Sequence, residues 1–109
     1  MTLEQILMAC NKFKIHTKRV ISDEYCELVI FNEDVDEWSI VLSSILGEAE
    51  KPRGIEPTPS DLELTKASGG IRVGQTLFKK EVGGLTIIAK FWPWEDKIHT
   101  TLKMALLPS

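Results

Sequence analysis

The residues best suited to chemistry stand close together near the C-terminal end of the sequence. Two indoles, two carboxylates and one imidazole occur at Trp92, Trp94, Glu95, Asp96 and His99. The indoles would form an apolar platform beside two negative charges, and His99 would titrate near neutral pH. Such a set could hold a cationic or planar ligand, or could serve general acid–base catalysis through His99. The competing interpretation is that both tryptophans only pack and that Glu95 and Asp96 form a solvated turn.

Three segments with a two-residue period surround this corner and would position it: residues 75–80, 85–92 and 97–107. Alternation of this kind is typical of half-buried strands, because successive side chains point to opposite faces of a sheet. The connections between the segments are short, so we expect an antiparallel meander. If Trp92 pairs with His99 across the second connection, their side chains share one face of the sheet.

The first third of the chain predicts one helix and two strands. Apolar residues at helical spacing indicate a helix over residues 2–13, with Thr2 and Gln5 forming a capping box at its start. Residues 15–21 and 25–31 read as strands. The second is rich in β-formers and is expected at the centre of the sheet, whereas the charged first strand suits an edge.

A second helix should follow, capped by Asn32 or Asp34, ending near Leu46 and stopped by Gly47. Residues 48–60 contain three prolines and are expected to form a flexible loop. Residues 61–66 fit either a short strand or a single helical turn capped by Ser60 or Asp61.

Composition narrows the class of protein. The chain has 109 residues and a net charge of −3, which favours one domain and makes general nucleic-acid binding unlikely. The two cysteines, Cys10 and Cys26, are expected to be buried thiols, and scattered Cys and His residues predict neither a metal site nor a cofactor. No run is apolar enough to cross a membrane, so we expect a cytoplasmic protein.

These observations predict an α+β fold in two layers, with two amphipathic helices packed on a mainly antiparallel sheet of about five or six strands. The sheet face away from the helices would carry a surplus of apolar residues among lysines, namely Phe78, Ile88, Trp92, Ala105 and Leu107. A surface of this kind often marks an interface, so the first hypothesis is a protein-binding or self-assembly module, with a homodimer through the sheet. The alternative is a ligand-binding protein or enzyme that uses the corner from Trp92 to His99.

Overall fold

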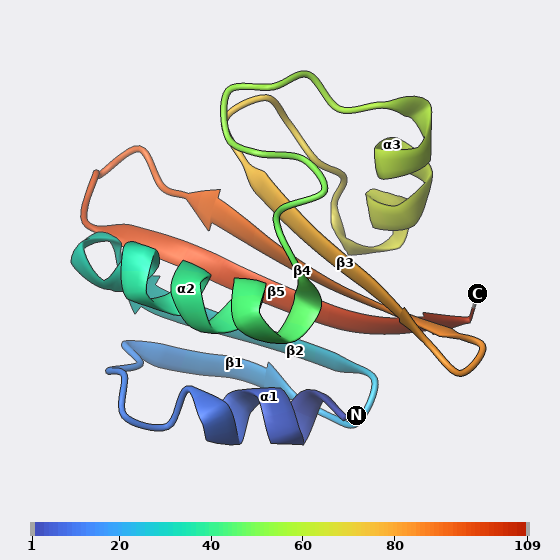
Figure 1. Ribbon diagram of the computed structural model, residues 1–109. Coiled ribbons are helices and arrows are strands. Elements are labelled where there is room, and N and C mark those ends of the chain that lie inside the picture. The colour runs from blue at the N-terminus through green and yellow to red at the C-terminus, as the bar shows by residue number, and fades with distance from the viewer. Residues whose placement is uncertain (1, 109) are drawn as a thin grey trace.

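The computed structural model describes residues 2–108, which form a five-stranded antiparallel sheet and three α-helices. The strands are β1 (Thr17–Ile21), β2 (Tyr25–Phe31), β3 (Thr76–Val82), β4 (Leu85–Pro93) and β5 (His99–Pro108). Their order in the sheet is β1-β2-β5-β4-β3 (Figure 1). The predicted α+β architecture and the C-terminal meander are therefore confirmed.

The strand register explains which segments are central. β2 pairs with β5 from Tyr25 opposite Ala105 to Phe31 opposite His99, so it lies between two neighbours as expected. β1 lies at one edge, begins at Thr17 rather than at residue 15, and all five of its residues are exposed. A bulge between Lys18 and Val20 shifts its register. Bulges and positive charges are both features that discourage an edge strand from pairing with another chain.

Two helices, α1 (Leu3–Ala9) and α2 (Val35–Leu46), cover one face of the sheet (Figure 1). The capping box of Thr2 and Gln5 is present, but α1 ends at Ala9 and not at residue 13 as predicted. The chain tightens there, because the N–H of Cys10 donates to the Leu7 carbonyl three residues back. The following turns still bring Phe13 against the main core, where its ring lies 5.2 Å from that of Trp38 in α2.

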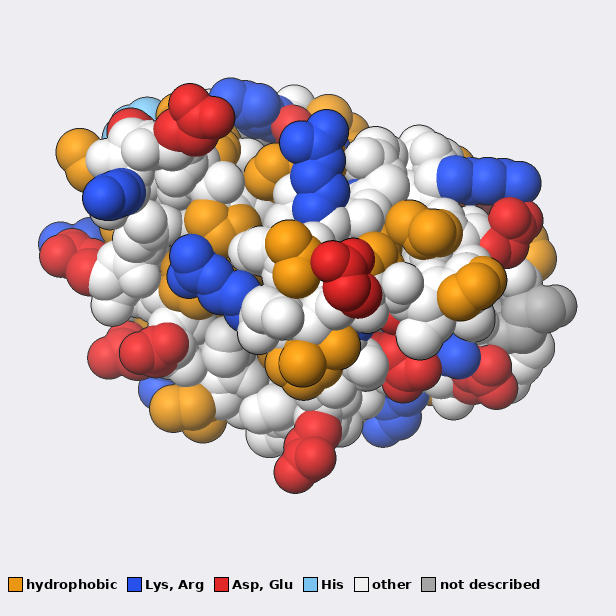
Figure 2. Space-filling model, turned by 90° about the horizontal axis from the view of Figure 1, so that it is seen from above, with side chains coloured by type: hydrophobic (Ala, Val, Ile, Leu, Met, Phe, Trp, Pro, Cys, Tyr) orange, Lys and Arg blue, Asp and Glu red, His pale blue; other side chains and the backbone are white. Residues whose placement is uncertain are grey.

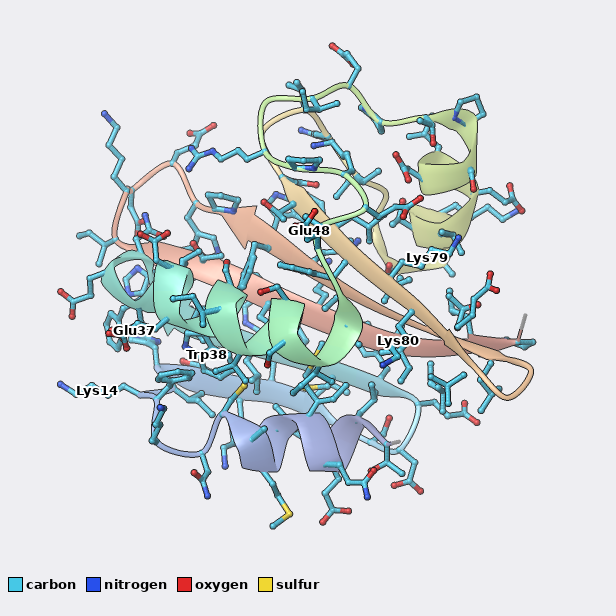
Figure 3. All side chains as sticks on the ribbon, viewed as in Figure 1. Lys14, Glu37, Trp38, Glu48, Lys79 and Lys80 are labelled. Carbon is cyan, nitrogen blue, oxygen red and sulfur yellow. The ribbon has the colours of Figure 1, made fainter. Side chains whose placement is uncertain are left out.

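The main core lies between these helices and the sheet. Figure 3 shows Trp38 on the side of α2 that faces α1. Phe78 belongs to this core, which corrects the prediction that it lies on the opposite face. Its register partner is Ala89, a core residue, and the neighbouring Leu77 takes the other face. Either residue of the apolar pair 77–78 could be assigned to the core from the sequence, and a shift of one residue reverses every side chain of a strand.

A third helix, α3 (Pro59–Thr65), lies where the sequence predicted a loop followed by a short strand or a single turn. Thr58, rather than Ser60 or Asp61, caps it: the Thr58 hydroxyl accepts from the Asp61 N–H at 3.1 Å. The Asp61 carboxylate in return accepts from the Thr58 N–H at 2.9 Å. Pro59 stands at the first helical position, where a proline has no hydrogen bond to lose.

The segment before α3 is fastened to β3 through Lys51. Its backbone forms an isolated antiparallel bridge with Leu77. Its ammonium group donates to the carbonyls of Pro52, Val73 and Gln75, at 3.0, 3.1 and 2.5 Å. On the upper side of the molecule, hydrophobic side chains are interspersed with lysines, arginines and carboxylates (Figure 2). Within residues 2–108 no helix is long and apolar enough to cross a membrane.

Candidate functional site

The sheet face away from α1 and α2 is covered over only part of its area. Residues 59–75, with α3, pack on the side of β3 and β4 and bury a small cluster. The buried members of that cluster are Ile71, Leu77, Ile88 and Ala105. The remaining part, over β4, β5, β2 and β1, is open to solvent and forms a groove.

This groove is shallow and open to solvent, has a volume of about 510 Å³, and is lined by side chains from four strands and from the turn that follows β4. Its lining residues are Arg19, Glu27, Trp92, Pro93, Trp94, Glu95, Thr101 and Lys103. Three of the predicted site residues, Trp92, Trp94 and Glu95, are among them. A volume of this size is in the range of small-molecule sites, which run from roughly 300 to 1,000 Å³.

Trp92 forms one wall of the groove and is surrounded by positive charge. Its register partner is Thr101, so the predicted pairing with His99 is wrong. The hairpin turn is longer than expected, and Trp94 is the residue whose N–H bonds to the His99 carbonyl, at 2.9 Å. The Nζ atoms of Lys103 and Lys90 lie 4.5 and 5.5 Å from the centroid of the Trp92 ring. The Arg72 guanidinium lies 6.0 Å from the same ring.

Trp94 also lines the groove, and three contacts hold its indole. The Nε1–H donates to Thr101 Oγ1 at 2.8 Å. The ring lies 5.0 Å from that of His99, and the Arg19 guanidinium lies 5.5 Å from its centroid. The indole is therefore fixed in orientation, while part of its surface remains exposed in the groove.

Asp96 and His99 stand behind Trp94 rather than in the lining of the groove. The Asp96 carboxylate lies 2.6 Å from His99 Nδ1 and also accepts from the N–H groups of Ile98 and His99. The bond to the His99 side chain is the largest reason why the pKa of Asp96 falls to about 2. A charged carboxylate thus orients the imidazole, the arrangement that proton-transfer sites use. The His99 ring packs 4.6 Å from His16 and 5.7 Å from Phe31.

The sequence analysis missed five residues of the groove: Arg19, Glu27, Pro93, Thr101 and Lys103. Arg19 Nη1 lies 3.4 Å from Glu27 Oε2, and the Tyr25 hydroxyl donates to Glu27 Oε1 at 2.9 Å. For two of these residues the sequence did contain a signal, namely a charged residue inside a mostly apolar strand. Glu27 and Lys103 both interrupt such strands, and they stand opposite each other in the register of β2 and β5.

Within the described part of the chain, no three His, Cys, Asp or Glu side chains are placed to hold a metal ion. Comparisons with models of protein families, with curated proteins and with solved structures found no match to this chain. The proposals below therefore rest on the geometry of the groove itself.

Proposed function

We propose that this chain is a ligand-binding domain that holds a small planar molecule in the groove between Trp92 and Trp94. The observation that carries this proposal is the pair of indoles, two positions apart and on one side of the sheet, that wall a hollow of about 510 Å³. Aromatic rings bind planar groups by offset or edge-to-face stacking. Thr101 fixes the Trp94 indole before any ligand arrives, which lowers the entropy lost on binding.

The groove also supports the ligand hypothesis over the hypothesis of a homodimer through the sheet. That hypothesis depended on apolar side chains left over on the second face. Ile88 and Ala105 are instead buried beneath residues of the chain itself, among them Ile71. Self-association stays a prediction, and light scattering over a wide concentration range would test it directly.

The test of the ligand proposal uses a neutral planar probe, N-phenyl-1-naphthylamine, whose own fluorescence rises when it leaves water. We expect saturable binding to the wild-type chain and a dissociation constant about tenfold higher in Trp94→Leu, because one stacking wall is lost. The matched control is Ile40→Ala, which removes an apolar side chain, 68% exposed, from the helical layer and should bind as wild type does. Equal affinity in the wild type and Trp94→Leu would contradict the proposal, as would the lack of any saturable binding.

A further inference from the structure

Two lysines stand directly opposite each other inside the sheet. Lys90 on β4 and Lys103 on β5 are register partners, and both side chains lie on the groove side of the sheet. Like charges placed opposite each other on neighbouring strands destabilise a sheet. Lys90 is also fully buried, with an exposed fraction of 1%. A buried ammonium normally has a carboxylate or a full set of hydrogen-bond acceptors.

The carboxylate whose charge acts most on Lys90 is engaged elsewhere. Glu27 is the register partner of Lys103, but its two oxygens contact the Arg19 guanidinium and the Tyr25 hydroxyl. Among residues 2–108, the ion pairs within 4 Å include neither Lys90 nor Lys103. The positive charge of this lysine pair is therefore only partly offset within the described chain.

Backbone carbonyls beside the pair accept hydrogen bonds from both ammonium groups. Lys90 Nζ donates to the carbonyls of Ser68 and Gly70, at 2.7 and 2.8 Å. Lys103 Nζ donates to the same Ser68 carbonyl at 3.2 Å. Lys90 makes two bonds to this turn, whereas Lys103 makes a single, longer one. The Lys103 ammonium, which also lies over the Trp92 ring, therefore retains donor capacity for a ligand.

Lys103 is the member of the pair that lines the groove, next to Trp92. An anion in the groove could accept from the Lys103 ammonium while the ring attached to it contacts an indole wall. The buried Lys90 would add its positive charge from behind Lys103. Burial, and then the charge of Lys103, lower the pKa of Lys90 to about 8, so at neutral pH this lysine is still mostly charged.

We infer that the ligand of the groove carries an anionic group, a carboxylate or a phosphate, which Lys103 binds beside Trp92 with the charge of Lys90 behind it. This inference rests on the proposed function and adds the chemical class of the ligand. It also gives the lysine pair a reason, because the anion would add to the counter-charge of Glu27, a single carboxylate that Arg19 also contacts.

The test compares two probes that differ by one charged group. 1-Anilinonaphthalene-8-sulfonate carries a sulfonate, and N-phenyl-1-naphthylamine is its neutral counterpart. We expect the wild-type chain to bind the sulfonate probe about tenfold more tightly, as a charge-assisted hydrogen bond allows. Lys103→Met should remove this preference, whereas Lys103→Arg should keep most of it. Lys18→Met makes the same change of charge on the edge strand, where Lys18 is exposed, and should leave the preference unchanged.

The outcomes separate the two proposals. Equal binding of both probes, unaffected by Lys103→Met, would overturn the anionic ligand and leave the aromatic groove in place. Binding of neither probe would overturn the proposed function and this inference together. Circular dichroism of each variant shows whether the fold is retained, and Lys103→Gln, which also removes the charge, supplies the test if Lys103→Met does not fold.

Competition against the bound sulfonate probe then identifies the anionic group. Benzoate and phenyl phosphate present a carboxylate and a phosphate on the same ring, and neutral benzyl alcohol is the control. Stronger displacement by benzoate would assign a carboxylate, and stronger displacement by phenyl phosphate would assign a phosphate. Displacement by both anions no better than by benzyl alcohol would overturn the inference.

Discussion

Two regions of this molecule bury a lysine to the same degree and treat its charge differently. Lys51 and Lys90 are each only 1% exposed. The Lys51 ammonium donates to three carbonyls, and the charges that act on it most are the carboxylates of Asp61 and Glu56. The Lys90 ammonium donates to two carbonyls, and the strongest charge acting on it is a second lysine.

On the proposed function, the difference separates a lysine that fastens the fold from one that contributes charge to a ligand site. Burial lowers the pKa of Lys51, but both neighbouring carboxylates oppose that effect, and every ammonium hydrogen has an acceptor. The Lys90 ammonium has one carbonyl acceptor fewer, and the strongest charge acting on it has the same sign. It also lies close to Trp92, a residue that lines the groove. Residues with strongly shifted pKa values are common at functional sites, because function often requires a charge at a position where that charge does not favour folding.

The largest expected effect comes from removing the fastening lysine. Lys51→Met leaves three carbonyls without their donor, so the free energy of unfolding should fall by about 2–4 kcal/mol. Urea unfolding would measure it. Lys66→Met is the matched control, since Lys66 forms an exposed ion pair with Glu63 and should contribute under about 0.5 kcal/mol. A loss for Lys51→Met no larger than that of the control would show that Lys51 does not fasten the loop.

The turn beside the lysine pair offers the next largest effect. Gly69 and Gly70 both have positive φ, at 98° and 81°. A Cβ on Gly69 would lie 3.1 Å from Trp92 Cζ3 and 3.3 Å from Lys103 Nζ, whereas one on Gly70 would meet nothing within 4 Å. Gly70→Ala should therefore cost only backbone strain, about 1 kcal/mol, and Gly69→Ala about 1 kcal/mol more.

Thermal unfolding of both glycine variants would give this difference, and probe binding would show whether Trp92 has moved. If both variants lose equal stability, the contact of the turn with Trp92 and Lys103 is not a constraint on the fold.

The pH dependence of stability should report Lys90 directly. Its pKa is about 8 in the fold against 10.5 for an ordinary lysine, so between these values the unfolded chain binds more protons and stability rises with pH. Burial raises the pKa of Cys10 and Cys26 to about 11 from 9.0, so these thiols lower stability as the pH rises and already offset part of the Lys90 gain between pH 8 and 9. From pH 8 to 9 we therefore expect a gain of about 1 kcal/mol from Lys90.

Urea unfolding at the two pH values would measure this gain. The difference between the wild type and Lys90→Met isolates the lysine: the change in the free energy of unfolding from pH 8 to 9 should be about 1 kcal/mol less favourable in the variant. A rise of the same size in the wild type and the variant would assign the effect to other groups, such as Lys51.

The smallest expected effects concern the charges around Lys90. Lys103→Met should raise the pKa of Lys90 and Glu27→Gln should lower it, because these two groups act on Lys90 with opposite sign. Titration of the lysine side-chain resonances by NMR would measure both shifts. If Lys103→Met leaves the titration of Lys90 unchanged, the two ammonium groups do not interact and the comparison with Lys51 loses its basis.

Local sequence signals predicted most of the elements of this fold. The strand at residues 25–31 was placed correctly because its β-formers are interrupted by a single charge. The sequence predicts helix at α3 only as one of two alternatives, a single turn over residues 61–66, because Pro57 and Pro59 favour a loop before it. The pattern of Thr58 and Asp61, three positions apart with a proline between them, was the signal that could have revealed a helix start.

From the sequence, only those groove residues that belong to a single hairpin could be predicted. Trp92, Trp94 and Glu95 are close in sequence, and their proximity follows from the hairpin alone. Arg19 and Lys103 are 84 positions apart, and both line the groove because β2 pairs with β5 between them. Long-range pairing of this kind depends on the packing of the whole sheet, and a local pattern contains no record of it.

The labelling rates of the two buried thiols would report how often different parts of the molecule unfold locally. Cys10 closes the seven-residue helix α1, and Cys26 lies in β2 between two strands. A thiol must reach solvent and lose its proton before an alkylating reagent can modify it, and burial hinders both steps. The labelling rate at Cys10 would then measure how often α1 lifts from the sheet, and the rate at Cys26 how often the sheet itself comes apart.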